Sequence, residues 1–175
     1  MTTTKVGNVE QNERTAMAQK VDTQPDGIGL RIGKRSEISG ILPLVPGGAR
    51  MFRERLPQFH AEAAYWEERV GTVHVFHMFL IDNDTKIFFG VVYYGDFKVY
   101  FEDLANKAAA WFDNLLLGVM EGYKGMNSPG FVEWFGQFLI SAEFFYASYP
   151  ESTRNDVKKA LRVRGAFEHL LDEVQ

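Results

Sequence analysis

Two histidines lie within one of the most apolar segments of the chain, residues 71–97. His74 and His77 are three residues apart, so a regular strand points their rings to opposite faces of a sheet. Imidazole changes its charge near neutral pH and is a common metal ligand, which makes each ring a candidate for acid–base chemistry or for coordination. This spacing excludes a chelating pair on a regular strand. A bulge would change this, and nothing in the sequence requires one.

His74 is the better candidate of the two for a direct chemical role. It shares a strand face with Phe76 and Met78, which suits a pocket wall or a subunit interface. We predict that His74 acts as a general base or a haem ligand, and a histidine buried against a backbone carbonyl is the alternative. His77 lies with the valines and phenylalanines that we expect to meet the helices. Side chains of this strand and of later strands complete the predicted cofactor- or ligand-binding set: His74, Phe76, Met78, Tyr94 and Tyr146.

Composition and spacing exclude several other kinds of catalytic site. The chain has no cysteine, which excludes disulfides, thiolate metal sites and cysteine nucleophiles. His60 and Glu62 have the histidine-x-glutamate spacing of zinc deaminases, but that chemistry also needs a cysteine pair. The segment GIGLRIG lacks the third glycine of a dinucleotide-binding loop, which would stand at Ile32, so we interpret it as a turn or a short strand. We predict no metal site.

Length and composition indicate a globular protein. The chain has 175 residues, of which 46% are hydrophobic and 24% are charged, enough for one domain with a sizeable core. The net charge of −4 argues against a nucleic-acid partner, which normally requires a basic surface. The N-terminus lacks the apolar core of a signal peptide, and no run of residues is apolar enough to span a membrane. We therefore expect a cytoplasmic protein.

Hydrophobic periodicity predicts strands and amphipathic helices in alternation. Apolar residues in steps of four and three predict helices over residues 52–70 and 97–119, and Pro57 should bend or divide the first. The polar link at residues 82–85 suits a hairpin turn. Strands are predicted at residues 38–45, 72–81, 86–94 and 141–149, Asp96 caps the second helix, and further helices begin near Ser128 and after Thr153.

This order of elements predicts an α+β fold of the ferredoxin-like βαββαβ type, with a four-stranded antiparallel sheet and an extra C-terminal helix. Residues 1–35 are polar and show no periodicity, so we predict a flexible N-terminal arm there. Residues 36–149 form the predicted ferredoxin-like domain. Residues 150–175 form a C-terminal helix that we expect to pack on the domain.

The strands at residues 72–81 and 86–94 are apolar on both faces. In an antiparallel sheet with one solvent-exposed face, apolar and polar residues should alternate along each strand. Leaving four such side chains per strand in water would sacrifice several kcal/mol at roughly 25 cal/mol per Å². A second copy of the sheet would cover the bare face, since two-fold dimers are the commonest soluble assemblies. The alternative is that a later helix of the same chain folds over this face.

Three segments carry a resemblance to a known group of proteins: GILPLVPGGARMFRERL, GTVHVFHMFLID and YYGDFKVYFEDL. They resemble a poorly characterised bacterial family of the dimeric α+β barrel superfamily, and the likeness covers residues 38–122. It implies a dimeric α+β barrel with a cavity between sheet and helices or between two sheets. Members of the superfamily include haem-dependent peroxidases, chlorite-decomposing enzymes, haem-degrading and cofactor-independent monooxygenases, and non-catalytic proteins.

The sequence and the resemblance together lead to two hypotheses. The first is a homodimer that binds a small hydrophobic molecule in an aromatic-lined cavity. If it is an enzyme, the resemblance favours oxidative chemistry, with haem or an organic substrate near His74. The second is a non-catalytic interaction or assembly protein, in which the aromatic face is only an interface between copies of the chain.

Overall fold

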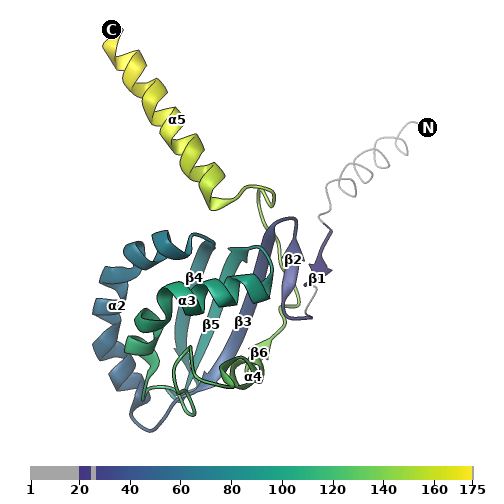
Figure 1. Ribbon diagram of the computed structural model, residues 1–175, viewed down its shortest axis with the longest axis vertical. Helices are drawn as coiled ribbons and strands as arrows, with labels where there is room; N and C mark the ends of the chain where they lie inside the picture. The colour runs from purple at the N-terminus through teal and green to yellow at the C-terminus, as the bar shows by residue number, and fades with distance from the viewer. Residues whose placement is uncertain (1–19, 25–26, 175) are drawn as a thin grey trace, which may run out of the picture.

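The computed structural model describes residues 20–24 and 27–174. Within them, an antiparallel sheet of six strands is covered on one face by helices (Figure 1). The strand order is β1-β2-β3-β5-β4, and β6 also pairs with β3. The strands are β1 (Asp22–Thr23), β2 (Leu30–Ile32), β3 (Arg35–Pro43), β4 (Val73–Ile81), β5 (Lys86–Tyr94) and β6 (Leu139–Ile140). The helices are α2 (Gly48–Val70), α3 (Phe97–Leu116), α4 (Phe131–Gly136) and α5 (Arg154–Glu173).

The hairpin of β4 and β5 confirms the strongest strand prediction. Asp82, Asn83 and Asp84 all adopt positive φ in the turn, and polar residues of this kind tolerate that conformation. Arg53 of α2 forms a bidentate ion pair with the Asp84 carboxylate and so joins the turn to the helix. β5 lies between β3 and β4, which leaves β4 at the edge of the sheet.

The main core lies between the sheet and α2 and α3, which cover the same face (Figure 1). Ile38 and Leu42 of β3 and Ile87 of β5 are at most 2% exposed, and they belong to one buried cluster with Ala108 and Leu115 of α3. Alternation along the strands puts these side chains on the helix-covered face. α2 continues through Pro57 as one helix, so the predicted division at this proline is absent.

The prediction of a four-stranded sheet was wrong, and both ends of the chain explain why. Residues 22–23 and 30–32 lie in the predicted flexible arm but form β1 and β2, which extend the sheet beyond β3. The strand predicted at residues 141–149 is absent. Because β5 occupies one edge of β3 along its full length, β2 and the two-residue β6 share the other edge, at residues 35–36 and 39–40. Little edge remains there for a longer strand.

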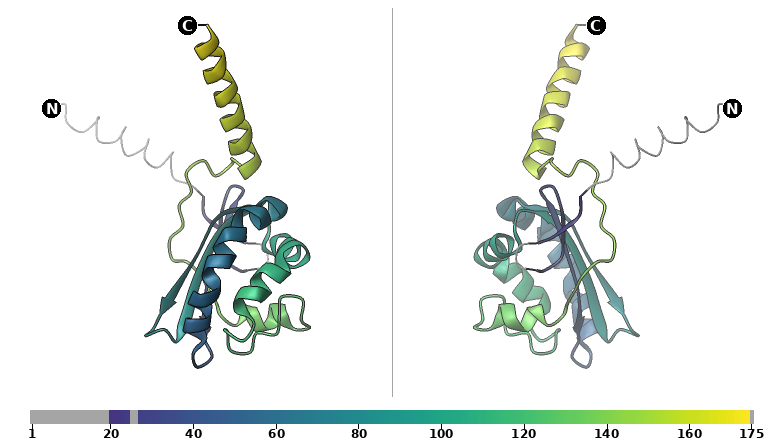
Figure 2. Two further views of the ribbon diagram at one scale, coloured as in Figure 1. Left: turned by 90° about the vertical axis from the view of Figure 1, so that its left-hand side faces the viewer. Right: turned by 90° about the vertical axis from the view of Figure 1, so that its right-hand side faces the viewer.

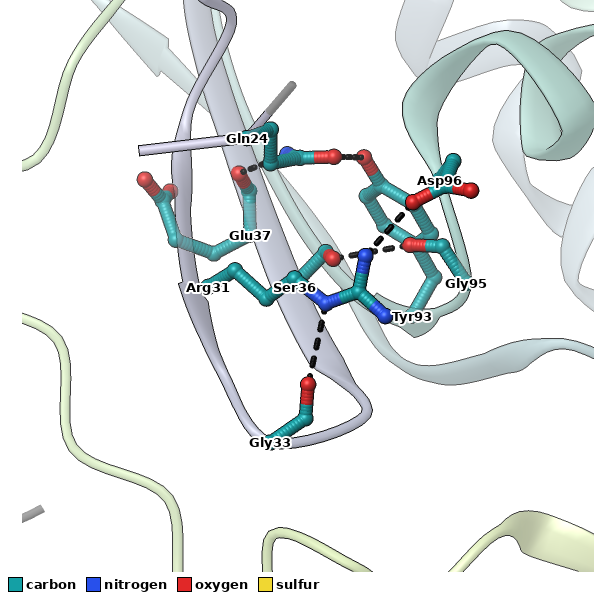
Figure 3. A network of polar contacts seen from close by, with 8 residues as sticks. All are labelled: Gln24, Arg31, Gly33, Ser36, Glu37, Tyr93, Gly95 and Asp96. Carbon is teal, nitrogen blue, oxygen red and sulfur yellow. Dashed lines mark hydrogen bonds and ion pairs between the residues drawn. The ribbon is translucent and has the colours of Figure 1, made fainter. Parts of the chain in front are cut away.

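Side-chain hydrogen bonds attach the short β1–β2 hairpin to the domain (Figure 3). The Tyr93 hydroxyl donates to the Gln24 side chain at 3.0 Å, and the Gln24 amide donates to the Glu37 carbonyl. Arg31 of β2 reaches Asp96 at the start of α3, at 2.5 Å. The predicted N-cap residue Asp96 therefore stands at the predicted position, but its carboxylate binds Arg31 and makes no cap hydrogen bond.

Glu37 is a buried carboxylate at the junction of several segments, with 5% of its surface exposed. Its side chain accepts hydrogen bonds from the backbone N–H of Leu30 in β2 and from the Ser39 hydroxyl. Burial raises its pKa, while bonds from Leu30, Ala142 and Ser39 oppose that rise. Ala142 lies just after β6, so this one carboxylate joins the hairpin near the N-terminus to the segment that leads to α5.

α5 projects away from the domain (Figures 1 and 2), which corrects the prediction that it packs there. Thr153 caps it as predicted, in a reciprocal capping box with Asp156. No residue of α5 is buried. Its contacts with the domain come from its first turns, where Arg154 and Lys158 pair with Glu67 and Glu68. None of the described helices is long and apolar enough to cross a membrane.

Candidate functional site

A groove of about 340 Å³ lies between α2, α3 and the edge strand β4. Helical periodicity brings apolar side chains of α2 and α3 to its walls, and β4 contributes Phe76 and Met78. Phe76 and Met78 also line a smaller cavity of about 70 Å³ deeper in the core, toward α4. The two hollows therefore share part of their lining.

A stacked aromatic pair builds one wall of the groove. The rings of Phe59 in α2 and Trp111 in α3 lie 3.9 Å apart and are nearly parallel, at 4°. The indole N–H of Trp111 donates to the Phe59 carbonyl at 3.0 Å, which fixes the orientation of the indole. Phe112 meets Phe76 edge-on at 5.8 Å. Offset and edge-on aromatic contacts of this kind are favourable, so these rings form a preorganised apolar wall.

Four polar residues lie around this apolar surface: His60, Glu67, His74 and His77. Glu67 forms an ion pair with Arg154 at 2.5 Å, which ties the groove to the first residue of α5. Among the described residues, no group of three or more histidine, aspartate or glutamate side chains is arranged to hold a metal ion. The polar groups of the groove can therefore orient a ligand, but they do not form a metal centre.

A β-bulge determines the position of His74. The pairing register of β4 with β5 shifts between Val73 and Val75, so one extra residue lies in β4 at this point. The His74 ring meets Tyr94 at 6.0 Å, and its Nε2 is buried without a hydrogen-bond partner among the described residues. Burial lowers its pKa to about 4, and the positive charge of Arg35 adds to the effect. The ring is therefore neutral near pH 7 and is a weak base.

The prediction that His77 meets the helices was wrong. The His77 ring stacks on Phe88 at 5.9 Å, and Phe88 and Tyr94 lie on the same side of β5. That side is opposite to the buried face that carries Tyr93. The ring of His77 therefore faces away from the helices, whereas His74, at the bulge, contacts Tyr94 and also lines the groove. His77 is exposed and does not meet the helices.

Three of the five predicted binding residues come together at the groove: His74, Phe76 and Met78. Tyr94 contacts His74 but does not line the groove. Tyr146 is 62% exposed in the segment after β6 and lies outside the site. Helical spacing predicts that Phe59, Trp66 and Trp111 lie on the apolar stripes of the two helices, but it does not predict that they line a groove. The available signal was that these three residues lie on two helices that are both predicted to cover the same sheet.

The geometry around His74 gives little support for haem binding. Nε2 of His74 is enclosed by protein atoms, which leaves Nδ1 as the ring nitrogen that could bind an iron. The groove volume also lies near the lower end of the range for small-molecule pockets. The site therefore gives no support to haem-dependent chemistry.

His74 should make the protein less stable in mild acid. Because its folded pKa of about 4 lies below its ordinary 6.5, the unfolded chain binds a proton before the folded chain does as the pH falls. Stability is fully present above pH 6.5 and decreases toward pH 4. Water still reaches part of the ring, so we expect a loss of about 1–2 kcal/mol from this residue.

Urea unfolding at about pH 7 and about pH 4.5 measures this loss. His74→Gln, which cannot titrate, should show a smaller decrease between the two conditions than the wild-type protein. His77→Gln is the matched control because His77 is exposed on the same strand. Equal acid-induced losses in the wild type and in His74→Gln would contradict the assignment.

Comparison of the chain with family models, with curated proteins and with solved structures finds no match. Membership of the dimeric α+β barrel superfamily therefore stays a prediction from the three short segments. The groove between α2 and β4 is the feature on which a functional conclusion can be built.

Proposed function

We propose that this protein binds a small hydrophobic molecule, with at least one planar ring, in the groove between α2, α3 and β4. The observation that carries the proposal is the groove itself, about 340 Å³ and lined mainly by apolar and aromatic side chains. Ligand pockets typically have volumes of about 300–1,000 Å³ and combine an apolar lining with a few polar groups.

The polar residues of the groove suggest how such a molecule would be oriented. His60 of α2 is exposed, whereas Phe59 and Trp111 are buried at the wall. A ligand would place its ring against the aromatic wall and direct one polar group toward solvent, near His60 and Glu67. A strongly charged molecule would lose its hydration against an apolar surface, which disfavours that class of ligand.

The substitution Ala63→Phe tests the proposal by filling the groove. Ala63 is partly buried and lines the groove, so a phenyl ring there would occupy the space proposed for the ligand. We expect the affinity for the neutral fluorescent probe N-phenyl-1-naphthylamine to decrease by about tenfold or more, which is about 1.4 kcal/mol. Fluorescence titration of the purified full chain measures this change.

Ala64→Phe is the matched control, since the neighbouring Ala64 is exposed on the same helix and does not line the groove. Its affinity for the probe should equal that of the wild-type protein. Equal probe binding by Ala63→Phe and the wild type, or no binding by the wild type, would reject the groove as the ligand site.

The ferredoxin-like assignment belongs to the same proposal. It is supported by the strand order β6-β3-β5-β4, in which every neighbouring pair is antiparallel. The helices α2 and α3 follow β3 and β5 in the chain, as a βαββαβ unit requires. Oxidative chemistry near His74 has no such support from the geometry and forms no part of the proposal.

A further inference from the structure

α5 is an amphipathic helix whose apolar side chains have no partner within the described chain. Side chains along its length are exposed, among them Leu161 at 59%, Phe167 at 59% and Leu170 at 55%. A helix of 20 residues receives most of its stability from packing of its apolar face. The apolar residues of this face recur at helical spacing: Val157, Ala160, Val163, Phe167, Leu170 and Val174.

The charges of α5 are arranged in two blocks. Basic side chains precede Gly165, and acidic side chains follow it. The first turn contains Asp156, and no basic residue occupies the last turn. This order is unfavourable for a helix alone, because the helix dipole favours acidic groups near the N-terminus and basic groups near the C-terminus. The basic block is Arg154, Lys158, Lys159, Arg162 and Arg164, and the acidic block is Glu168, Asp172 and Glu173.

Ion pairs to α2 fix the direction in which α5 leaves the domain. Arg154 contacts Glu67 at 2.5 Å and Glu68 at 2.7 Å, and Lys158 also pairs with Glu68. Hydrogen bonds from Lys158 and Arg154 lower the pKa of Glu68 to about 2. Because these ion pairs hold the first turns of α5 against α2, the rest of the helix extends away from the sheet (Figure 2). Its apolar face is therefore available to an external partner.

We propose that α5 pairs in antiparallel orientation with α5 of a second copy of this chain. Antiparallel pairing places the basic block of one helix beside the acidic block of the other, twice in a symmetric dimer. It also buries the apolar faces of both helices together. Parallel pairing would place like charges side by side, and like charges at a helix interface are unfavourable. The proposal does not depend on the ligand groove.

Charge reversal tests the pairing, and exchange of both blocks keeps the intrahelical pair of Arg164 and Glu168 with its charges reversed. Changing Lys159, Arg162 and Arg164 to Glu should raise the dimer dissociation constant of the full chain by about tenfold or more, measured by sedimentation velocity. Changing Glu168, Asp172 and Glu173 to Lys should have the same effect. The variant with all six changes should dimerise like the wild type, because the two blocks are then exchanged. The all-six exchange suits the helix dipole, so circular dichroism should show no loss of helix in that variant.

Single cysteines test the orientation, since the chain has no cysteine of its own. In an antiparallel pair the middles of the two helices meet, so Val163→Cys should crosslink to itself with the short reagent bismaleimidoethane. Val157→Cys, near one end, should not crosslink. Crosslinking at both positions would indicate parallel pairing and overturn the proposal. A monomeric wild-type chain, or a dimer unaffected by Phe167→Ser with Leu170→Ser, would overturn it as well.

Discussion

Replacing Trp111 by alanine should lower the free energy of unfolding by about 3–5 kcal/mol, the usual cost of removing a buried tryptophan side chain. Trp111 is 8% exposed and stacks on Phe59 with a ring separation of 3.9 Å. Its indole N–H also donates to the Phe59 carbonyl, which joins α3 to α2. The substitution therefore removes packing, a stacked pair and a buried hydrogen bond between the two helices that cover the sheet. Urea or thermal unfolding of the purified protein measures the loss.

Two further variants separate the parts of this effect. Trp111→Phe keeps an aromatic ring but removes the donor, so we expect a smaller loss of about 1–2 kcal/mol. Trp66→Ala is the control for tryptophan content. Trp66 is only partly buried and donates to Glu62 in its own helix, so its removal should cost clearly less than that of Trp111. If Trp66→Ala and Trp111→Ala proved equally destabilising, the role assigned to the Phe59–Trp111 pair would be wrong.

The elements that the sequence predicts correctly are those with a dense and continuous pattern. β4 and β5 combine β-branched and aromatic residues with a polar turn between them. α2 and α3 carry long apolar stripes with steps of three and four. The core that these elements form decides which face of the sheet the helices cover. Periodicity therefore recovered the central part of the fold.

Pairing and register were not predictable in the same way. Residues 141–149 are rich in aromatic residues, but Phe144 and Tyr149 are 82% and 80% exposed there. Composition suggested a strand, and it could not show that β2 and β6 already share the available edge of β3. The bulge near His74 likewise has no signal in the sequence, because it adds one residue to the pairing without altering the apolar pattern.

The candidate site was predictable only in part, because the sequence does not determine how separate elements are placed against one another. Phe76 and Met78 follow from alternation along one strand, so their shared face was predictable. The wall that faces them comes from two helices, and the angle at which the helices cross the sheet decides which of their residues meet the strand. Sequence spacing within each helix does not contain that angle. Phe59 and Trp111 are thus predictable as apolar positions of their helices but not as the wall of a groove.

The substitution Gly29→Ala should detach the β1–β2 hairpin from the domain. Gly29 has a φ of +73°, and a Cβ there would lie 2.0 Å from the backbone carbonyl oxygen of Glu37. Neither atom can move away without separating β2 from β3. We expect a stability loss of about 3 kcal/mol or more, from backbone strain and overpacking together. We expect the rest of the domain to stay folded, so that the loss is limited to the contacts of the hairpin.

Gly27→Ala is the matched control for the conformational part of this effect. Gly27 has a similar φ of +78°, but no atom of the described residues lies within 4 Å of the position of its Cβ. It should therefore show only the cost of the backbone conformation, about 1 kcal/mol. Limited trypsin digestion reports the detachment directly, since cleavage after Arg31 requires β2 to leave the sheet. Cleavage there should be fast in Gly29→Ala and slow in Gly27→Ala. Equal protection in the two variants would mean that the hairpin does not depend on the close approach of Gly29 to the backbone of Glu37.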